Sequence, residues 1–466
     1  MKAKFFSMSL LCMLIASSCN SDRFSDTEML SRDNSVEYVD NPYTLDENEI
    51  ADLAMSFFST SDVVLRSGKN GKNLSQSVKT KDFDVRNNKM SKEKGKEVKQ
   101  KVPVYTVNYT DEAGKASGFV VIAGDERIQD KELIFNETAD FDISKRDDAA
   151  FIEDLIAGYL YNNINGLQTK KEVNTRLRIV TDYGNTEVIG IPYSISLGQY
   201  VDPYNRYTPF RNGKRSPAGP EAVAMAEIMA YHDWPQKGAF KRYTTNTTTP
   251  ETVSVSYVLT SAERQALINN NKMYEYQDLI YSYPNVLEYI ANLLIETGYK
   301  LNSNYGMDIT SANPMQVQTV FAQMGYTTDA IKEYDLASIK AELTVERPVF
   351  MTAWSSAYDT YYGLQPYSYV IPSFNNDLTG VKPSWICVIH GAWGDSYYQD
   401  PITGYYQNWF NSEMFSKTTE SDYQEDPKNI TYPYRFQCRI ITNIKPNFSN
   451  SGSTDPNWRV SSMFSY

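Results

Sequence analysis

Histidine and cysteine are scarce in this chain of 466 residues, which contains two histidines and four cysteines. Zinc sites draw most of their ligands from these two residue types, so the scarcity excludes a metal site built from several histidines. A mechanism that needs an imidazole base can use only His232 or His390. We therefore expect neither a metal nor another cofactor.

Positive charge is also in short supply, because 45 Lys and Arg face 57 Asp and Glu and the formal net charge is -12. A chain with this excess of negative charge is repelled by phosphate backbones, which argues against nucleic acid as a partner. Tyrosine, in contrast, is abundant at 36 residues. Its rings favour contacts with a protein or peptide ligand.

The start of the chain has the pattern of a bacterial export signal. A charged segment, Met1–Lys4, precedes the apolar Phe5–Ala16, which is too short to span a bilayer. The signal ends at Cys19 in a motif similar to a lipobox, although Ala16 stands where leucine is usual. We expect removal of residues 1–18, lipidation of Cys19 and a tether over 19–40, with the following Asn-Ser-Asp loosely similar to Bacteroidales export tags. The expected location is the bacterial cell envelope (outer membrane or cell surface), with plain secretion as the alternative.

Two cysteines remain in the folded part once Cys12 and Cys19 are assigned to the leader and the anchor. Cys387 and Cys438 both lie in apolar, strand-like runs. Two buried free thiols and one disulfide are both compatible with this pattern.

The first third of the chain predicts a small unit of helices and strands. The Lys- and Ser-rich segment 66–101 is expected to be a solvated loop. A polar linker is expected near Asn174–Asn185. Periodicity predicts helices over Asp46–Phe58 and Ala150–Asn163, and strands over Pro103–Tyr109 and Gly118–Ala123.

A helix with almost no charge is predicted after Gly219. Gly219 suits the N-cap, Pro220 the first helical position, and Glu221 the positive end of the helix dipole. The residues from Ala222 to Met229 are almost all apolar, so the helix should be buried nearly all round. Pro235 ends it.

This helix resembles the central helix of the streptopain (C10) family of papain-like cysteine peptidases. The family pattern reads Ala-Gly-Cys-Val-Ala-Thr/Val-Ala-Met-Ala-Gln-Ile-Met, followed by Tyr-His and a proline. The matching residues here are Ala218, Gly219, Ala222, Val223, Ala224, Met225, Ala226, Ile228, Met229, Tyr231, His232 and Pro235. Pro220 stands where the family has its nucleophilic cysteine, and proline has no nucleophilic group.

The resemblance extends over most of the chain and implies an α+β fold, a papain-like domain preceded by a small α+β prodomain. Gly118–Arg127 is similar to a segment of the family's inhibitory prodomain. We expect a prodomain over 41–173 containing the loop 66–101, a papain-like domain over 186–445, and a tail over 446–466.

The same resemblance suggests the other positions of the former active site. Gln199, in Leu-Gly-Gln, matches a glutamine whose amide helps to form the oxyanion hole. Trp385 stands at the position of the histidine base, and His390 falls where the family has an aspartate. Asn408 and Trp409 match part of the Asn-Trp-Gly-Trp motif that orients the base.

Loss of both the nucleophile and the base predicts a peptidase relative that no longer hydrolyses peptides. We expect it to bind a protein or peptide in the former substrate cleft, and to contact the membrane through its N-terminal lipid. An active cysteine endopeptidase with a displaced nucleophile, Cys387 or Cys438, is one alternative. A structural envelope protein with an empty cleft is the other.

Overall fold

The computed structural model describes most of the chain between residues 36 and 447. The described residues are 36–60, 75–114, 116–128, 130–136, 140–143, 149–166, 186–190, 195, 197–244, 249–268, 282–308, 310–355, 366–377, 385–389, 407–415 and 436–447. No helix within these ranges is both long enough and apolar enough to cross a membrane.

The described residues of the N-terminal part form helices and strands. Its elements are β1 (Glu37–Val39), α1 (Glu47–Thr60), β2 (Ser75–Arg86), α3 (Asn88–Lys94), β3 (Val98–Thr110), β4 (Ala116–Ala123), β5 (Glu132–Asn136) and α4 (Ala149–Ile164). A capping box starts α1, because Asp46 accepts from the backbone of Glu49 at 2.9 Å while Glu49 accepts from the backbone of Asp46 at 2.8 Å.

The C-terminal part gathers most of its helices before its long strands. Its helices are α5 (Pro220–His232), α6 (Ser261–Ile268), α8 (Pro284–Lys300), α9 (Val317–Gln323) and α10 (Leu336–Thr344), with the short η4 (Pro314–Gln316) and η7 (Ser412–Phe415). Its longer strands are β6 (Thr186–Gly190), β9 (Lys237–Arg242), β10 (Glu251–Ser256), β15 (Val349–Ser355), β16 (Pro366–Asp377), β17 (Trp385–Ile389), β18 (Gln407–Asn411) and β19 (Phe436–Ile441). Two-residue strands are β7 (Phe210–Arg211), β8 (Lys214–Arg215), β11 (Asn304–Tyr305), β12 (Thr310–Ser311), β13 (Tyr326–Thr327), β14 (Lys332–Glu333) and β20 (Lys445–Pro446).

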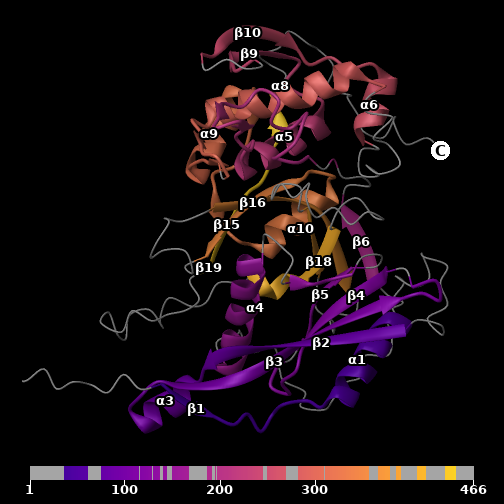
Figure 1. Cartoon of the computed structure of the whole chain (residues 1–466), viewed down its shortest axis with the longest axis vertical. Helices are drawn as coiled ribbons and strands as arrows, with labels where there is room; N and C mark the ends of the chain where they lie inside the picture. The colour runs from indigo at the N-terminus through magenta and orange to yellow at the C-terminus, as the bar shows by residue number, and fades with distance from the viewer. Residues whose placement is uncertain are drawn as a thin grey trace, which may run out of the picture.

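One 12-stranded sheet runs through both parts of the molecule. Its order is β1-β3-β4-β5-β18-β17-β16-β15-β19-β14, with β2 paired to β3 and β6 to β16. The two parts join where β5 and β18 pair antiparallel, with Phe135 opposite Trp409 and Ile134 opposite Phe410. Figure 1 shows the N-terminal strands below and the C-terminal helices above, with β15, β16 and β18 between them.

The two faces of the N-terminal sheet are covered by different helices. On one face, Ile50 and Phe57 of α1 pack with Val107, Val120 and Phe135. On the other face, α4 lies against β2 and also contacts β15, β19 and η7 of the C-terminal part. Apolar residues of α4 therefore belong to the same buried core as those of α5 and α8.

The α+β prediction is confirmed, and the predicted helices and strands of the N-terminal part are present as α1, α4, β3 and β4. The expected solvated loop over 66–101 is wrong from residue 75 onward. Residues 75–86 pair with β3 along their whole length, and α3 follows, with Asn87 as N-cap and Gly95 in the left-handed conformation after it. Lysines on an edge strand discourage pairing with a second molecule. The resulting composition of β2 is also typical of a solvated loop, which explains the wrong prediction. The linker near 174–185 lies outside the described residues.

The shared core predicts that the two parts unfold together. Phe57 is 2% exposed and makes an edge-to-face contact with Phe135 at 5.1 Å, so Phe57→Ala should cost about 3 to 5 kcal/mol. All six tryptophans lie at or after Trp234, so tryptophan fluorescence during urea unfolding reports on the C-terminal part and, through Trp409, on its junction with β5. We expect Phe57→Ala to move this transition to lower urea.

The matched control is Met55→Ala, because Met55 lies on the same helix with 43% of its surface exposed. This substitution should leave the transition within about 0.5 kcal/mol of the parent. A fluorescence transition unmoved by Phe57→Ala would mean that the N-terminal part folds independently.

Candidate functional site

Pro220, the residue expected to stand at the family's nucleophile position, is the first residue of α5. Gly219 precedes it with φ at +97°, and a Cβ there would come within 3.0 Å of Cγ2 of Thr310. Glycine is therefore needed at this position for both conformation and space. Pro220 then begins the helix without requiring a partner for a backbone N–H. All residues from Glu221 to Tyr231 are buried, as their small and apolar side chains predict.

The structure brings Gln199 to the start of this helix. Its side-chain oxygen accepts from the backbone N–H of Gly219 at 3.0 Å, and its backbone carbonyl accepts from Ala218 at 3.0 Å. Gln199 is buried, with 4% of its surface exposed. Gln199 and Gly219 are twenty residues apart in the sequence, and these two hydrogen bonds hold Gln199 beside Pro220. An oxyanion-hole origin for Gln199 stays a prediction.

The strands expected to carry the base and its orienting motif are neighbours. β17 lies between β16 and β18, with Trp385 opposite Asn411 and Cys387 opposite Trp409. Asn408 is paired with Val388, three residues along from Trp385, which corresponds to about 10 Å. The sheet therefore brings the two strands together without placing Asn408 opposite Trp385. His390 lies outside the described residues.

The two cysteines of the folded part cannot form a disulfide with each other. β17, which carries Cys387, is separated from β19 by β16 and β15. Three strand spacings amount to about 14 Å, twice the longest Cα separation of about 7 Å that a disulfide spans. Cys438 is a buried free thiol, and burial raises its pKa well above the usual range. A thiol held protonated in this way is a poor nucleophile.

His232 is held neutral at the far end of α5. Burial lowers the pKa of its imidazole to about 3, and the ring packs edge-on against Tyr231 and Tyr326. Twelve residues of helix separate it from Pro220, or about 18 Å. His232 therefore cannot replace a base at the position of Trp385.

Two buried carboxyl groups on α5 were not recognised as unusual from the sequence. One oxygen of Glu221 accepts from the backbone of Ala312 at 3.3 Å, and the other has no partner within the described part. Burial raises the pKa of Glu221 to about 8, so the side chain is mostly protonated at neutral pH. Glu221 does lie in the first turn of α5, as expected, but loss of hydration outweighs the helix dipole and favours its neutral form.

Glu227 is the second buried carboxyl and stands where the family pattern has glutamine. It accepts from the backbone of Leu197 at 2.8 Å, and burial raises its pKa well above the usual range. A protonated glutamate has nearly the shape of glutamine, which explains its place in the core. The sequence did contain a signal for these buried carboxyl groups, because Glu221 and Glu227 lie in a segment that is otherwise almost uncharged.

Comparison with known proteins connects this region to cysteine peptidases. Residues 198–394 match the model of the Peptidase C10 family. Streptopain of Streptococcus pyogenes is 25% identical over 265 residues, which cover 50% of this chain and 61% of streptopain. The segment with Gln199, Pro220 and Trp385 is therefore similar to C10 peptidases, and the chain spans about three fifths of the curated relative that it matches.

Two solved structures are also similar to the chain. A prointerpain A fragment of Prevotella intermedia has 16% sequence identity and a TM-score of 0.44, and the match covers 72% of this chain and 94% of the fragment. Active wild-type interpain A cysteine protease of the same organism has 16% identity and a TM-score of 0.33, and the match covers 55% of this chain and 94% of that one.

The buried proton of Glu221 predicts a pH-dependent stability. The folded chain keeps this proton up to about pH 8, whereas the unfolded chain releases it near 4.5, so stability should fall as pH rises between these values. Each pKa unit corresponds to about 1.4 kcal/mol. Glu221→Gln should therefore be more stable than the parent at pH 8 by a few kcal/mol, with little difference below pH 4.5.

Urea unfolding at pH 4.5, 6, 7 and 8 measures this effect. Glu47→Gln, which removes an exposed glutamate from α1, should leave the pH dependence unchanged. A parent whose stability rises from pH 5 to pH 8 relative to Glu221→Gln would show that Glu221 is charged in the fold.

Proposed function

We propose that this chain is a C10-like peptidase relative that binds a peptide or protein without hydrolysing it, and is anchored in the cell envelope by a lipid at Cys19. The observation that carries the proposal is the start of α5, where Pro220 takes the nucleophile position directly beside Gln199. The neighbourhood of the active site is kept while the reacting group is absent.

The chemistry of a cysteine peptidase requires a thiolate at this position. A helix N-terminus stabilises the thiolate with backbone N–H groups and the helix dipole, which lowers the thiol pKa. Proline suits the same position structurally because its ring already has helical φ and it needs no N–H partner. The substitution therefore removes the reaction and preserves the helix.

Replacement of the base supports the same conclusion independently. An indole at Trp385 cannot accept a proton from a thiol. His232 is neutral and about 18 Å away along α5, so it does not compensate. The nucleophile and the base are replaced on two different elements, α5 and β17. A single substitution therefore does not account for the change.

The alternative of an active peptidase with a displaced nucleophile has little support. Cys438 is buried in β19 with a raised thiol pKa. Cys387 lies inside β17, and a position within a strand does not offer the helix N-terminus that favours a thiolate. A purely structural envelope protein would explain the lost groups but gives no reason for keeping Gln199 against Gly219.

The N-terminal part is proposed to stay attached as a permanent layer. In the resembling peptidases the prodomain is removed by the enzyme itself, and this chain lacks the groups for that step. The pairing of β5 with β18 and the position of α4 support retention, because removal would expose a strand edge and an apolar surface.

The first test is the reactivity of a restored thiol. The parent chain without residues 1–19 should not cleave casein. Pro220→Cys with Trp385→His should gain a thiol that iodoacetamide alkylates with a pKa at least one unit below the free value of about 8.5, since the helix N-terminus remains. The measurement is the alkylation rate between pH 5 and pH 10.

Pro220→Cys alone and the parent with Cys387→Ser are the matched controls. The single variant separates the effect of the helix from that of the new imidazole. Casein cleavage by the parent that disappears in Cys387→Ser would overturn the proposal in favour of a displaced nucleophile. A restored thiol titrating like free cysteine would mean that α5 does not present its N-terminus as described.

The second test is the size of the native protein. The detergent-extracted membrane fraction should contain one lipid-labelled species that begins at Cys19 and keeps residues 41–173, and Cys19→Ala should abolish the label. Immunoblotting with antibodies against each part measures this. A dominant species beginning near Asn185 without added protease would show self-processing and contradict the loss of activity.

A further inference from the structure

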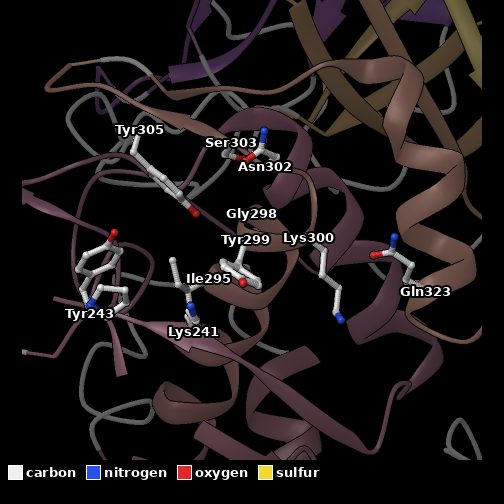
Figure 2. A pocket seen from close by; sticks show the side chains of 11 residues that line it. Lys241, Tyr243, Ile295, Gly298, Tyr299, Lys300, Asn302, Ser303, Tyr305 and Gln323 are labelled. Carbon is white, nitrogen blue, oxygen red and sulfur yellow. The ribbon is translucent and has the colours of Figure 1, made fainter. Parts of the chain in front are cut away.

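A cavity of about 510 Å³ lies at the C-terminal end of α8, remote from the nucleophile position in sequence. It is bounded by β9, the last turn of α8, β11 and α9 (Figure 2). Its volume falls within the range of about 300 to 1,000 Å³ that holds small molecules in proteins. Neither the loss of hydrolysis nor the peptidase resemblance uses this cavity.

Tyr305 projects its hydroxyl into the cavity wall beside α8, as Figure 2 shows. The hydroxyl oxygen is buried and has no hydrogen-bond partner within the described residues. Gly298 makes room for it, because a Cβ at this position would lie 2.1 Å from the hydroxyl. Burial raises the pKa of Tyr305, so the group stays protonated and can donate.

The remaining polar lining is also available for a ligand. None of the five other neutral polar side chains makes a hydrogen bond inside the part of the chain that the structure describes. They are Tyr243, Tyr299, Asn302, Ser303 and Gln323. Such a concentration of unused hydroxyl and amide groups, with aromatic rings between them, matches a ligand that carries several hydroxyl groups.

The charge of the lining suggests a ligand with one negative charge. Among the described residues, no carboxylate lines the cavity and Lys241 has no ion-pair partner. Lys300 is less available, because its ammonium lies 3.5 Å from Glu296, which also accepts from the hydroxyl of Tyr257 at 2.7 Å. The ammonium group of Lys241 can therefore neutralise one negative charge on a ligand.

The helix end argues against a doubly charged phosphate. The last turn of α8 faces the cavity, and the C-terminus of a helix carries the negative end of its dipole. Phosphate sites in proteins use the opposite helix end, where N–H groups point at the ligand. Carbonyl groups of the last turn, those of Thr297, Gly298 and Tyr299, already accept from the backbone of the residues that follow the helix, so the lining side chains are left to meet a ligand's hydroxyls.

We propose that this cavity binds an acidic sugar, a hydroxylated ring with a single carboxylate, whose hydroxyls meet the tyrosine and amide groups and whose carboxylate meets Lys241. Tyr305 pairs with Thr310, and Thr310 donates to the backbone of Pro217, so the β11–β12 hairpin connects the cavity to the start of α5. The β11–β12 hairpin thus contacts both the proposed sugar site and the proposed peptide-binding surface.

Calorimetric titration of the full mature chain with three probes tests the proposal. D-glucuronate should bind at least tenfold more tightly than D-glucose, which lacks the charge, and than D-glucose 6-phosphate, which is dianionic. Lys241→Gln should weaken glucuronate about tenfold and leave glucose unchanged, whereas Lys237→Gln, on the same strand, should change neither. Tyr305→Phe should weaken glucuronate and glucose by the same factor.

Three outcomes would overturn the assignment. One is the absence of saturable glucuronate binding by the parent chain, and another is equal glucuronate affinity of the parent and Lys241→Gln. The third is tighter binding of glucose 6-phosphate, which would make this a phosphate site. Because Pro220 and Trp385 are unchanged in every variant, failure here leaves the proposed loss of hydrolysis standing.

Discussion

Exclusion of water from α5 is the constraint on which the site depends. Every residue from Glu221 to Tyr231 is buried, so any ionisable group on this helix must be neutral or compensated. Glu221 and Glu227 keep their protons and His232 loses its own, for the same reason. A helix adapted in this way supports the surrounding fold and keeps its acids protonated at neutral pH.

The second organising feature is the continuity of the sheet across the two parts. Pairing of β5 with β18 gives backbone hydrogen bonds, and α4 fills the angle between the N-terminal strands and β15 and β19 (Figure 1). An N-terminal part held only through side-chain contacts would separate more readily. Here dissociation requires breaking strand pairing and exposing the core at the same time.

Local signals in the sequence were sufficient for much of the fold. Gly219, Pro220 and Pro235 bracketed α5, and alternation in 103–109 and 118–123 located β3 and β4. The strand β2 was missed because its lysines serve an exposed edge, which has the composition of a loop. The β5–β18 junction joins segments more than 270 residues apart, and no local periodicity encodes such a pairing.

The site was predictable only where its residues lie near a recognisable pattern. Gln199 and Pro220 were found through motifs, and the structure places them side by side. The protonation of Glu221 depends on its burial in the folded chain, and the cavity depends on the room that Gly298 leaves for Tyr305, so both need three-dimensional information.

The space that Gly298 leaves for the hydroxyl of Tyr305 restricts which substitutions the chain can accept during evolution. A Cβ at 298 would lie 2.1 Å from the hydroxyl, so any larger residue at this position requires the Tyr305 side chain to move. A lineage that lost Tyr305 would free position 298 to vary, and larger residues would then fill the cavity. The state of these two positions in related genomes is therefore a record of whether selection has maintained the cavity.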